Sequence, residues 1–156
     1  MTLISLLMLL ATHPLFGAGC GSATAEYNLL MQIRGREITG ICLMNLQPDS
    51  TVVGTVINEF GVKAFDFTRA DGKTNVLNVI GPLDKWYIRK VLRKDFTFIL
   101  SNIWQHKDVI WKKRKMTFST DGDIIVENQR FKIRYTFTPV GGDLSSPTPI
   151  VHETNQ

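Results

Sequence analysis

The sequence predicts an α+β protein, mostly β, in which a curved antiparallel sheet wraps around one main helix. Apolar residues recur in strand-like runs over most of the chain. Short turns join these runs, and short links favour antiparallel pairing. Only the stretch from Leu83 to about Ile103 has a helical period. Because strands and helix each carry an apolar face, a sheet curled around the helix buries both.

Composition excludes several classes of protein. The chain has 156 residues, the size of one ordinary domain, with 44% hydrophobic and 21% charged residues, which excludes wholesale disorder. No apolar run reaches the roughly 20 residues of a membrane-spanning helix, which excludes a polytopic membrane protein. Two cysteines exclude a multi-disulfide scaffold and a four-thiolate metal site.

The N-terminal residues predict where in the cell the protein is located. Leu3 to Ala11 is apolar and has the length of the hydrophobic region of a secretory signal. The small residues of 17–19 precede Cys20 and resemble the lipobox of bacterial lipoproteins, in which the cysteine is acylated. We therefore expect a lipoprotein signal peptide over 1–19, lipid attachment at Cys20 and an anchor linker over 20–26. A plain cleaved signal and an N-terminal core helix are the alternatives.

The predicted domain, 27–140, begins with three strand-like runs. Residues 27–35 and 36–46 are rich in apolar side chains, and turn residues follow at Gln47–Ser50. The third run is 51–58. Cys42 falls within an alternating segment, so we expect a buried structural thiol rather than a reactive one.

The next two runs flank a strong hairpin signal. In 61–69 the alternation slips at Ala64–Phe65, which indicates a β-bulge or a strand buried on both faces. Asp71-Gly72 suits the positive φ angles of a tight hairpin turn. Residues 74–80 are the predicted return strand.

The predicted helix is amphipathic. One half of the wheel is apolar and the other is basic and includes Trp86. The apolar half comprises Leu83, Tyr87, Ile88, Val91 and Leu92, and the basic half comprises Lys85, Arg89, Lys90, Arg93 and Lys94. The segment Phe96 to Leu100 is apolar on every side and could instead begin a strand.

Strand patterns return after the helix. The run 109–118 alternates imperfectly, Asp121-Gly122 predicts a turn, and 130–138 has the clearest period of two in the chain. Gly, Ser and Pro dominate beyond Pro139, so we expect a disordered tail over 141–156. The expected layout is a meander of about six strands, with the helix between the fourth and fifth.

No pattern indicates catalysis. The histidines are His13, His106 and His152, and no cluster of His, Cys or carboxylates has metal-ligand spacing. The sequence contains no nucleophile elbow, phosphate-binding loop or dinucleotide glycine pattern. We therefore expect no enzyme, no metal and no cofactor.

Basic residues are concentrated in one part of the chain. From Asp84 to Lys115 there are ten Lys or Arg and three Asp, a net +7, whereas the remainder has eight basic and eleven acidic residues, a net −3. The candidate basic surface comprises Lys85, Arg89, Arg93, Lys112 and Lys115, near Trp86, Trp104 and Trp111. This pattern suits nucleic acid, but a secretion signal argues against that partner. An anionic membrane surface and a simple solvated face are the alternatives.

Two segments resemble a known group of proteins. GTVINEFGVKAFDF, Gly54 to Phe67, and GPLDKWYIRKVLRKD, Gly81 to Asp95, resemble small uncharacterised lipoproteins of Bacteroidetes-type bacteria. The lipobox-like start, the meander and the helix in its concavity resemble the LolA/LolB superfamily of lipoprotein carriers over residues 27–138. The resemblance implies an open half-barrel with an apolar cavity for acyl chains.

Two functional hypotheses follow, one from the resemblance and one from the basic residues. The first is an outer-membrane lipoprotein, facing the periplasm, that binds a lipid or lipidated protein in a cavity opened by a helix shift. Its expected cavity lining is equally suited to a packed core and comprises Phe60, Phe65, Phe67, Tyr87, Val91, Phe131 and Tyr135. The second is a structural or adaptor lipoprotein that docks through the basic, Trp-containing surface. Both include a membrane anchor and neither includes nucleic acid.

Overall fold

A computed structural model describes residues 22–141, which form nine β-strands, one α-helix and two short 3₁₀ turns. The signal segment, Cys20 and residues 142–156 of the expected tail lie outside the described residues. In chain order the elements are β1 (Ala23–Ile33), β2 (Arg36–Leu46), β3 (Val52–Asn58), β4 (Lys63–Ala70), β5 (Lys73–Leu77), η1 (Gly81–Leu83), α1 (Trp86–Asn102), η2 (Ile103–Gln105), β6 (Val109–Trp111), β7 (Arg114–Phe118), β8 (Ile124–Asn128) and β9 (Ile133–Pro139).

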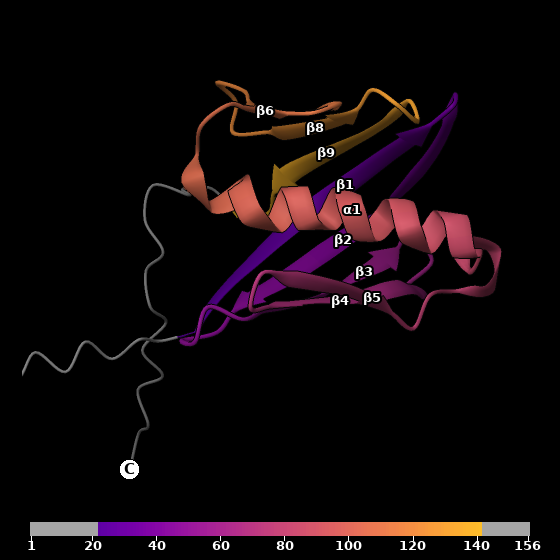
Figure 1. Ribbon diagram of the computed structural model, residues 1–156, viewed down its shortest axis with the longest axis horizontal. Helices are drawn as coiled ribbons and strands as arrows, with labels where there is room; N and C mark the ends of the chain where they lie inside the picture. The colour runs from indigo at the N-terminus through magenta and orange to yellow at the C-terminus, as the bar shows by residue number, and fades with distance from the viewer. Residues whose placement is uncertain (1–21, 142–156) are drawn as a thin grey trace, which may run out of the picture.

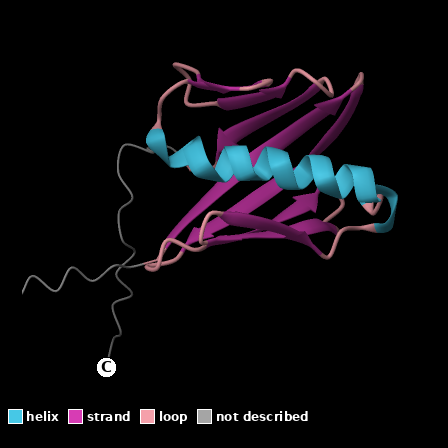
Figure 2. Ribbon diagram, viewed as in Figure 1, coloured by secondary structure: helices cyan, strands magenta, loops and turns pink. Residues whose placement is uncertain are grey.

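All nine strands belong to one open antiparallel sheet, in the order β5-β4-β3-β2-β1-β9-β8-β7-β6. The sheet curls, and α1 lies across its concave side between the two arms (Figures 1 and 2). This arrangement confirms the predicted fold class, a mostly β protein with a curved sheet around one main helix. In the described part of the chain, no helix has the length and apolarity needed to cross a bilayer.

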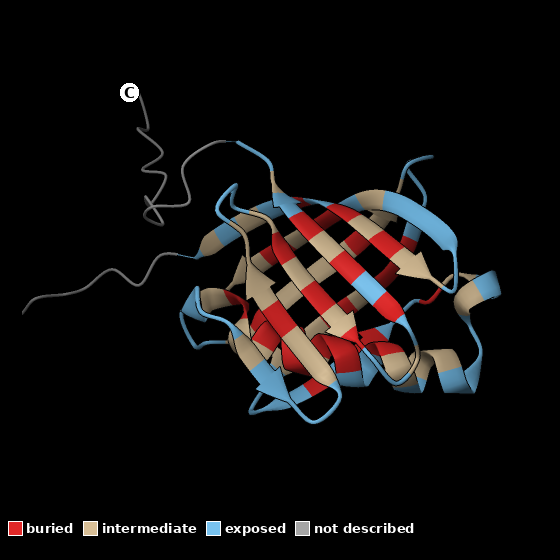
Figure 3. Cartoon of the chain, turned by 90° about the horizontal axis from the view of Figure 1, so that it is seen from above, coloured by how far each residue is buried: buried red, intermediate tan, exposed pale blue. Residues whose placement is uncertain are grey.

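The core lies between the sheet and α1. Inward side chains alternate along the strands with more exposed ones, as Figure 3 shows by the banding of the ribbon. Phe96 of α1 is at the centre, with its ring centroid 5.2 Å from that of Phe65 and 4.9 Å from that of Phe67. Tyr135 of β9 packs against the same ring at 6.2 Å. These aromatic contacts join the two arms of the sheet to the helix.

Of the two explanations for the slip at Ala64–Phe65, the β-bulge is confirmed. Val56 pairs with Phe65 and Ile57 pairs with Lys63, so Ala64 is the extra residue of a β-bulge. Opposite Phe67, Gly54 has no side chain, and a Cβ there would lie 2.3 Å from the Phe67 ring. The absence of a side chain at Gly54 lets that ring lie directly against the strand.

The hairpin predicted at Asp71-Gly72 is also confirmed, with φ angles of 50° and 73°. Phe96 to Leu100 belong to the helix, so the alternative that a strand begins there is wrong. However, α1 starts only at Trp86, because Gly81–Leu83, which contains Pro82, forms a separate 3₁₀ turn. It follows the fifth strand, not the fourth.

Other boundaries differ from the prediction. β1 begins at Ala23 and pairs with β2 from that residue, so most of the expected 20–26 linker is strand. The run 109–118 is a hairpin, β6 and β7, that turns at Lys112–Lys113. β8 was not predicted. β9 begins at Ile133, because 130–132 belong to the turn that precedes it.

Candidate functional site

The turns of the sheet gather at two opposite ends. Because neighbouring strands are antiparallel, every second connection returns to the same end. We call one the entry end, since α1 starts there, and the other the terminal end, since Ser22 and Gly141 lie there (Figure 1). The entry end comprises connections 34–35, 59–62, 78–85, 112–113 and 129–132, and the terminal end comprises 47–51, 71–72, 103–108 and 119–123.

The two ends carry opposite charge. The entry-end connections hold six basic residues and two acidic ones, a net charge of +4. The terminal-end connections hold one basic residue and five acidic ones, a net charge of −4. The entry-end set is Arg34, Lys85, Lys112, Lys113, Arg130 and Lys132 with Glu59 and Asp84, and the terminal-end set is Lys107 with Asp49, Asp71, Asp108, Asp121 and Asp123.

Large apolar side chains are also exposed at or beside the entry end. Phe60 is 81% exposed in the β3–β4 turn, and Trp86 is 76% exposed at the start of α1. Ile110, at 73%, and Trp111 lie at the end of β6. These side chains come from three places along the chain: the β3–β4 turn, the start of α1 and the end of β6.

Three of the entry-end turns place a basic residue in the left-handed region. The φ angles are 49° at Arg34, 55° at Lys112 and 54° at Lys132. Asn, Asp and Gly adopt this conformation more readily than long side chains do. The Lys112 ammonium also lies 4.4 Å from the centre of the Trp111 ring, so cation and aromatic ring are presented together.

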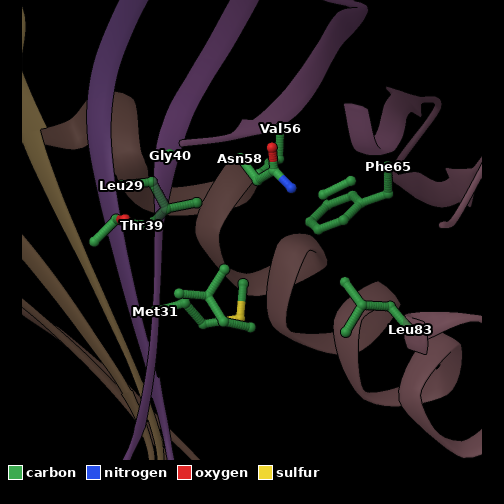
Figure 4. A pocket seen from close by; sticks show the side chains of 10 residues that line it. Leu29, Met31, Thr39, Gly40, Val56, Asn58, Phe65 and Leu83 are labelled. Atoms are coloured by element: carbon green, nitrogen blue, oxygen red, sulfur yellow. The ribbon is translucent and has the colours of Figure 1, made fainter. Parts of the chain in front are cut away.

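A narrow apolar cleft opens at the same end, between η1 and strands β1 to β4. Its volume is about 20 Å³, room for about one water molecule. Figure 4 shows Leu29 and Met31 on one side, with Phe65 and Leu83 on the other. The cleft is much smaller than the roughly 150 Å³ cavity that accepts benzene in another protein.

The seven predicted cavity residues do not share one cavity. Phe65, Phe67 and Tyr135 are fully buried in the core, and only Phe65 also lines the cleft. Val91 and Phe131 are half-buried at the edge of the core.

The other two predicted lining residues face solvent. The placement of Phe60 in a cavity is wrong, because the β3–β4 turn carries it beyond the sheet. Tyr87 is 54% exposed, because all buried residues of α1 come later in the helix, from Leu92 onward. Periodicity identifies the apolar side of a helix but does not show how far along it the sheet reaches.

The five predicted basic residues fall into two groups. Lys85, Arg89 and Arg93 are four residues apart along α1 and therefore share one face of it. Lys112 is in the β6–β7 turn and Lys115 is half-buried on β7. Arg89 forms an ion pair with Asp84, and the hydrogen bond it donates lowers the pKa of that carboxyl.

The prediction omitted Arg34, Lys113, Arg130 and Lys132, which also belong to the entry end. In an antiparallel meander every second connection lies at the same end of the sheet, so the order of the strands alone would have assigned these four residues to one end. The candidate basic surface, which groups residues that are close in the sequence, is therefore an incomplete description of the basic surface in the structure.

A buried polar cluster ties α1 to the arm formed by β7, β8 and β9. Arg114 Nε, at 2.8 Å, and Asn128 Nδ2, at 2.7 Å, donate to Asp95 Oδ1. The Tyr135 hydroxyl donates to Asp95 Oδ2 at 2.8 Å. Burial raises the pKa of Asp95 against the opposing effect of these partners, and burial beside Asp95 raises the pKa of Tyr135. The cluster is a structural link that the sequence did not indicate.

Few other reactive or titratable groups are buried in the described part of the chain. Cys42 is fully buried, as expected, and burial raises the pKa of its thiol, so it stays protonated. Burial, with a smaller effect of Cys42, raises the pKa of Tyr27 to about 12. Within residues 22–141, no group of three or more His, Cys, Asp or Glu is placed to hold a metal ion.

Comparisons with known protein families and with curated proteins give no match to this chain.

Proposed function

We propose that this protein is a non-catalytic docking protein of the bacterial cell envelope, which attaches through its entry end to an anionic surface. The observation that carries the proposal is the separation of charge, +4 at the entry end against −4 at the terminal end, with exposed aromatic residues at the positive end. A field of this kind attracts an anionic partner and orients it toward one end of the molecule.

The proposal includes a lipid anchor at Cys20, on the strength of the lipobox-like residues before it. β1 begins at Ala23, at the terminal end, so an anchor there leaves the entry end directed away from the anchoring membrane. β1 has eleven residues, so its two ends lie roughly 33 Å apart at a rise of about 3.3 Å per residue. Incorporation of radioactive palmitate that is lost in the Cys20→Ser variant would support this part, and equal labelling of the variant would reject it.

The docking proposal is tested with an immobilised anionic polymer. We expect the full chain to bind poly(glutamate), with an affinity that falls as NaCl rises. The Lys113→Ser/Arg130→Ser variant, which removes two entry-end charges, is expected to bind several-fold more weakly. The matched control is Lys73→Ser/Lys107→Ser, which removes Lys107 of the terminal end and Lys73 of β5, directly beside the 71–72 turn. Equal loss in both variants, or binding that salt does not affect, would contradict the proposal.

A second candidate function is the binding of an acyl chain, as the proposed relationship to LolA/LolB carriers implies. The apolar lining of the cleft beneath η1 favours it. Because the cleft holds about one water, η1 and the start of α1 would have to move outward to admit a hydrocarbon chain.

This second candidate has its own test. Protein carrying Cys20→Ser is expected to co-purify with lipid, or to gain thermal stability when fatty acid is added. A Leu83→Trp variant, which fills the cleft, should lose that gain. Mass spectra free of lipid together with an unchanged melting temperature would reject acyl-chain binding.

A further inference from the structure

We propose that the anionic surface recognised by the entry end is a phospholipid bilayer, with aromatic side chains entering the headgroup layer while basic side chains contact phosphates. This inference rests on the proposed docking function and specifies its partner. It is drawn from the shape of the entry end, the placement of its cations and the position of Ser22 and Gly141, the ends of the described residues.

The shape of the entry end suits a soft, flat partner. Phe60 protrudes from the β3–β4 connection, Trp86 from the start of α1 and Trp111 from the end of β6, and the cleft beneath η1 has a volume of only about 20 Å³. A protein partner would need a matching pocket for each protruding side chain. A bilayer accepts aromatic residues at headgroup depth whatever their spacing, and such rings are enriched at that depth.

The cations are placed next to these aromatic residues. Lys85 precedes Trp86, and Lys112 and Lys113 follow Trp111, with Lys112 held over the indole ring. Lysine and arginine can keep their charged ends among the phosphates while their apolar stems lie deeper. Each basic residue near an anionic membrane strengthens the attraction to it.

The backbone supports a role for the cations at the tips of the turns. Arg34, Lys112 and Lys132 occupy left-handed positions where Asn or Gly would be accommodated with less strain. Residues kept in such positions are found more often at functional sites than elsewhere. Replacing them with Asn should therefore relax the turns while weakening attachment, the opposite of what a purely structural role predicts.

The opposite end gives the docked protein one orientation. Its −4 charge is repelled by an anionic bilayer, and both ends of the described chain, Ser22 and Gly141, lie there. In this orientation the strands would run from the docked membrane toward the terminal end. If Cys20 is acylated, the membrane bound by the entry end is a different lipid surface from the one that holds the anchor.

A second copy of the chain is the competing occupant that charge alone would allow, since +4 and −4 are complementary. Large exposed apolar side chains are unevenly shared between the ends: Val140 is the one at the terminal end among the described residues, whereas Phe60, Trp86, Ile110 and Trp111 are at or beside the entry end. The chain also continues from both Ser22 and Gly141 at that end. These features favour lipid over head-to-tail association.

The test uses the full chain carrying Cys20→Ser and unilamellar vesicles of phosphatidylcholine with 0 or 30% phosphatidylglycerol. We expect flotation with the anionic vesicles only, and a blue shift of tryptophan emission, because Trp86 and Trp111 leave water. The Lys112→Asn/Lys132→Asn variant should partition about thirtyfold more weakly, at about 1 kcal/mol per basic residue. Its melting temperature should be unchanged or higher.

Two control variants separate the contribution of charge at the entry end from that of its aromatic side chains. The Lys73→Ser/Lys107→Ser variant, altered at the terminal end, should float as the parent does. The Trp86→Ser variant should lose part of the blue shift, since Trp111 still leaves water, and part of the binding, while its melting temperature stays within a few degrees of the parent value.

The outcomes distinguish this inference from the docking proposal. Binding to poly(glutamate) without binding to anionic vesicles would overturn the lipid inference and leave an acidic protein as the partner. Binding to neither would overturn both. Vesicle binding that the Lys112→Asn/Lys132→Asn variant retains in full would show that another surface contacts lipid, and concentration-dependent oligomers without vesicle binding would favour a second copy.

Discussion

The two halves of α1 differ in what they contact. From Leu92 to the end of the helix, the residues include all six that α1 buries. In the first six residues, Trp86 to Val91, none is buried. A single amphipathic helix is thus divided along its length into a segment with buried residues and a segment with none, in which Ile88 and Val91 only reach the edge of the core.

The difference follows from their partners. In the second half, Phe96 packs on three aromatic rings and Asp95 accepts hydrogen bonds from three side chains. In the first half, Trp86 and Tyr87 contact each other edge-on, at 6.0 Å between ring centroids, and Arg89 pairs with Asp84 just before the helix. Stability should therefore depend on the second half, and docking on the first.

The largest effect is expected for Phe96→Ala. Removing a fully buried ring leaves a cavity between helix and sheet, so the free energy of unfolding should fall by about 3–5 kcal/mol. Chemical denaturation would measure the loss. The matched variant in the first half, Tyr87→Ala, should lose less than about 1 kcal/mol, and similar losses in the two variants would contradict the division of the helix.

A smaller loss is expected for Tyr135→Phe. This change deletes one hydrogen bond to a buried carboxylate and leaves the ring packing intact, at a cost of about 1.5–3 kcal/mol. The control is Tyr87→Phe, since that residue is 54% exposed and its hydroxyl is accessible to water. Unfolding curves that coincide for Tyr135→Phe and the parent protein would show that the cluster adds no stability.

The dependence of stability on pH should also distinguish the halves. Burial raises the pKa of Asp95 above its ordinary value of 3.8, so the folded state holds this proton at a pH where the unfolded chain has released it. The contribution of Asp95 to the free energy of unfolding therefore decreases as pH rises above 3.8, by at most about 1.4 kcal/mol per unit.

Asp95→Asn should remove that slope. The measurement is the difference in unfolding free energy between parent and variant as a function of pH, because Asp84 and Asp66 have lowered pKa values and contribute with the opposite sign. A difference that stays constant from pH 4 to 7 would argue against titration of Asp95 in this range.

The smallest effect on stability is expected for Trp86→Ala. The side chain is 76% exposed and touches only its neighbour Tyr87 among the aromatic residues, so the free energy of unfolding should change by no more than about 0.5 kcal/mol. Attachment to an anionic surface should nevertheless weaken. A large drop in melting temperature would place Trp86 in the structural half of the molecule.

Much of the fold was predictable because its signals are local. Inward Tyr135 and Phe137 alternate with outward residues along β9, the bulge at Ala64 interrupts a period of two, and Asp71-Gly72 supplies the φ angles of a tight turn. Each of these can be identified within about ten residues of sequence.

The missed features depend on contacts between distant residues or on unusual backbone. Lys112–Lys113 turns the chain without Gly, Pro or Asn, so β6 and β7 read as one strand. β8 has only five residues, too few for its alternation to stand out. The Asp95 cluster joins residues 19 to 40 positions apart, and it is a polar group in a region that periodicity marks as apolar core.

The missing side chain at Gly54 links these parts of the molecule. The Phe67 ring rests against the bare backbone at that position and also supports Phe96, the centre of the buried half of α1. A single added methyl group at Gly54 would push the Phe67 ring toward α1 and displace Phe96. The glycine thus determines how closely α1 packs on the sheet, and with it how far the exposed first turns of α1 project at the entry end.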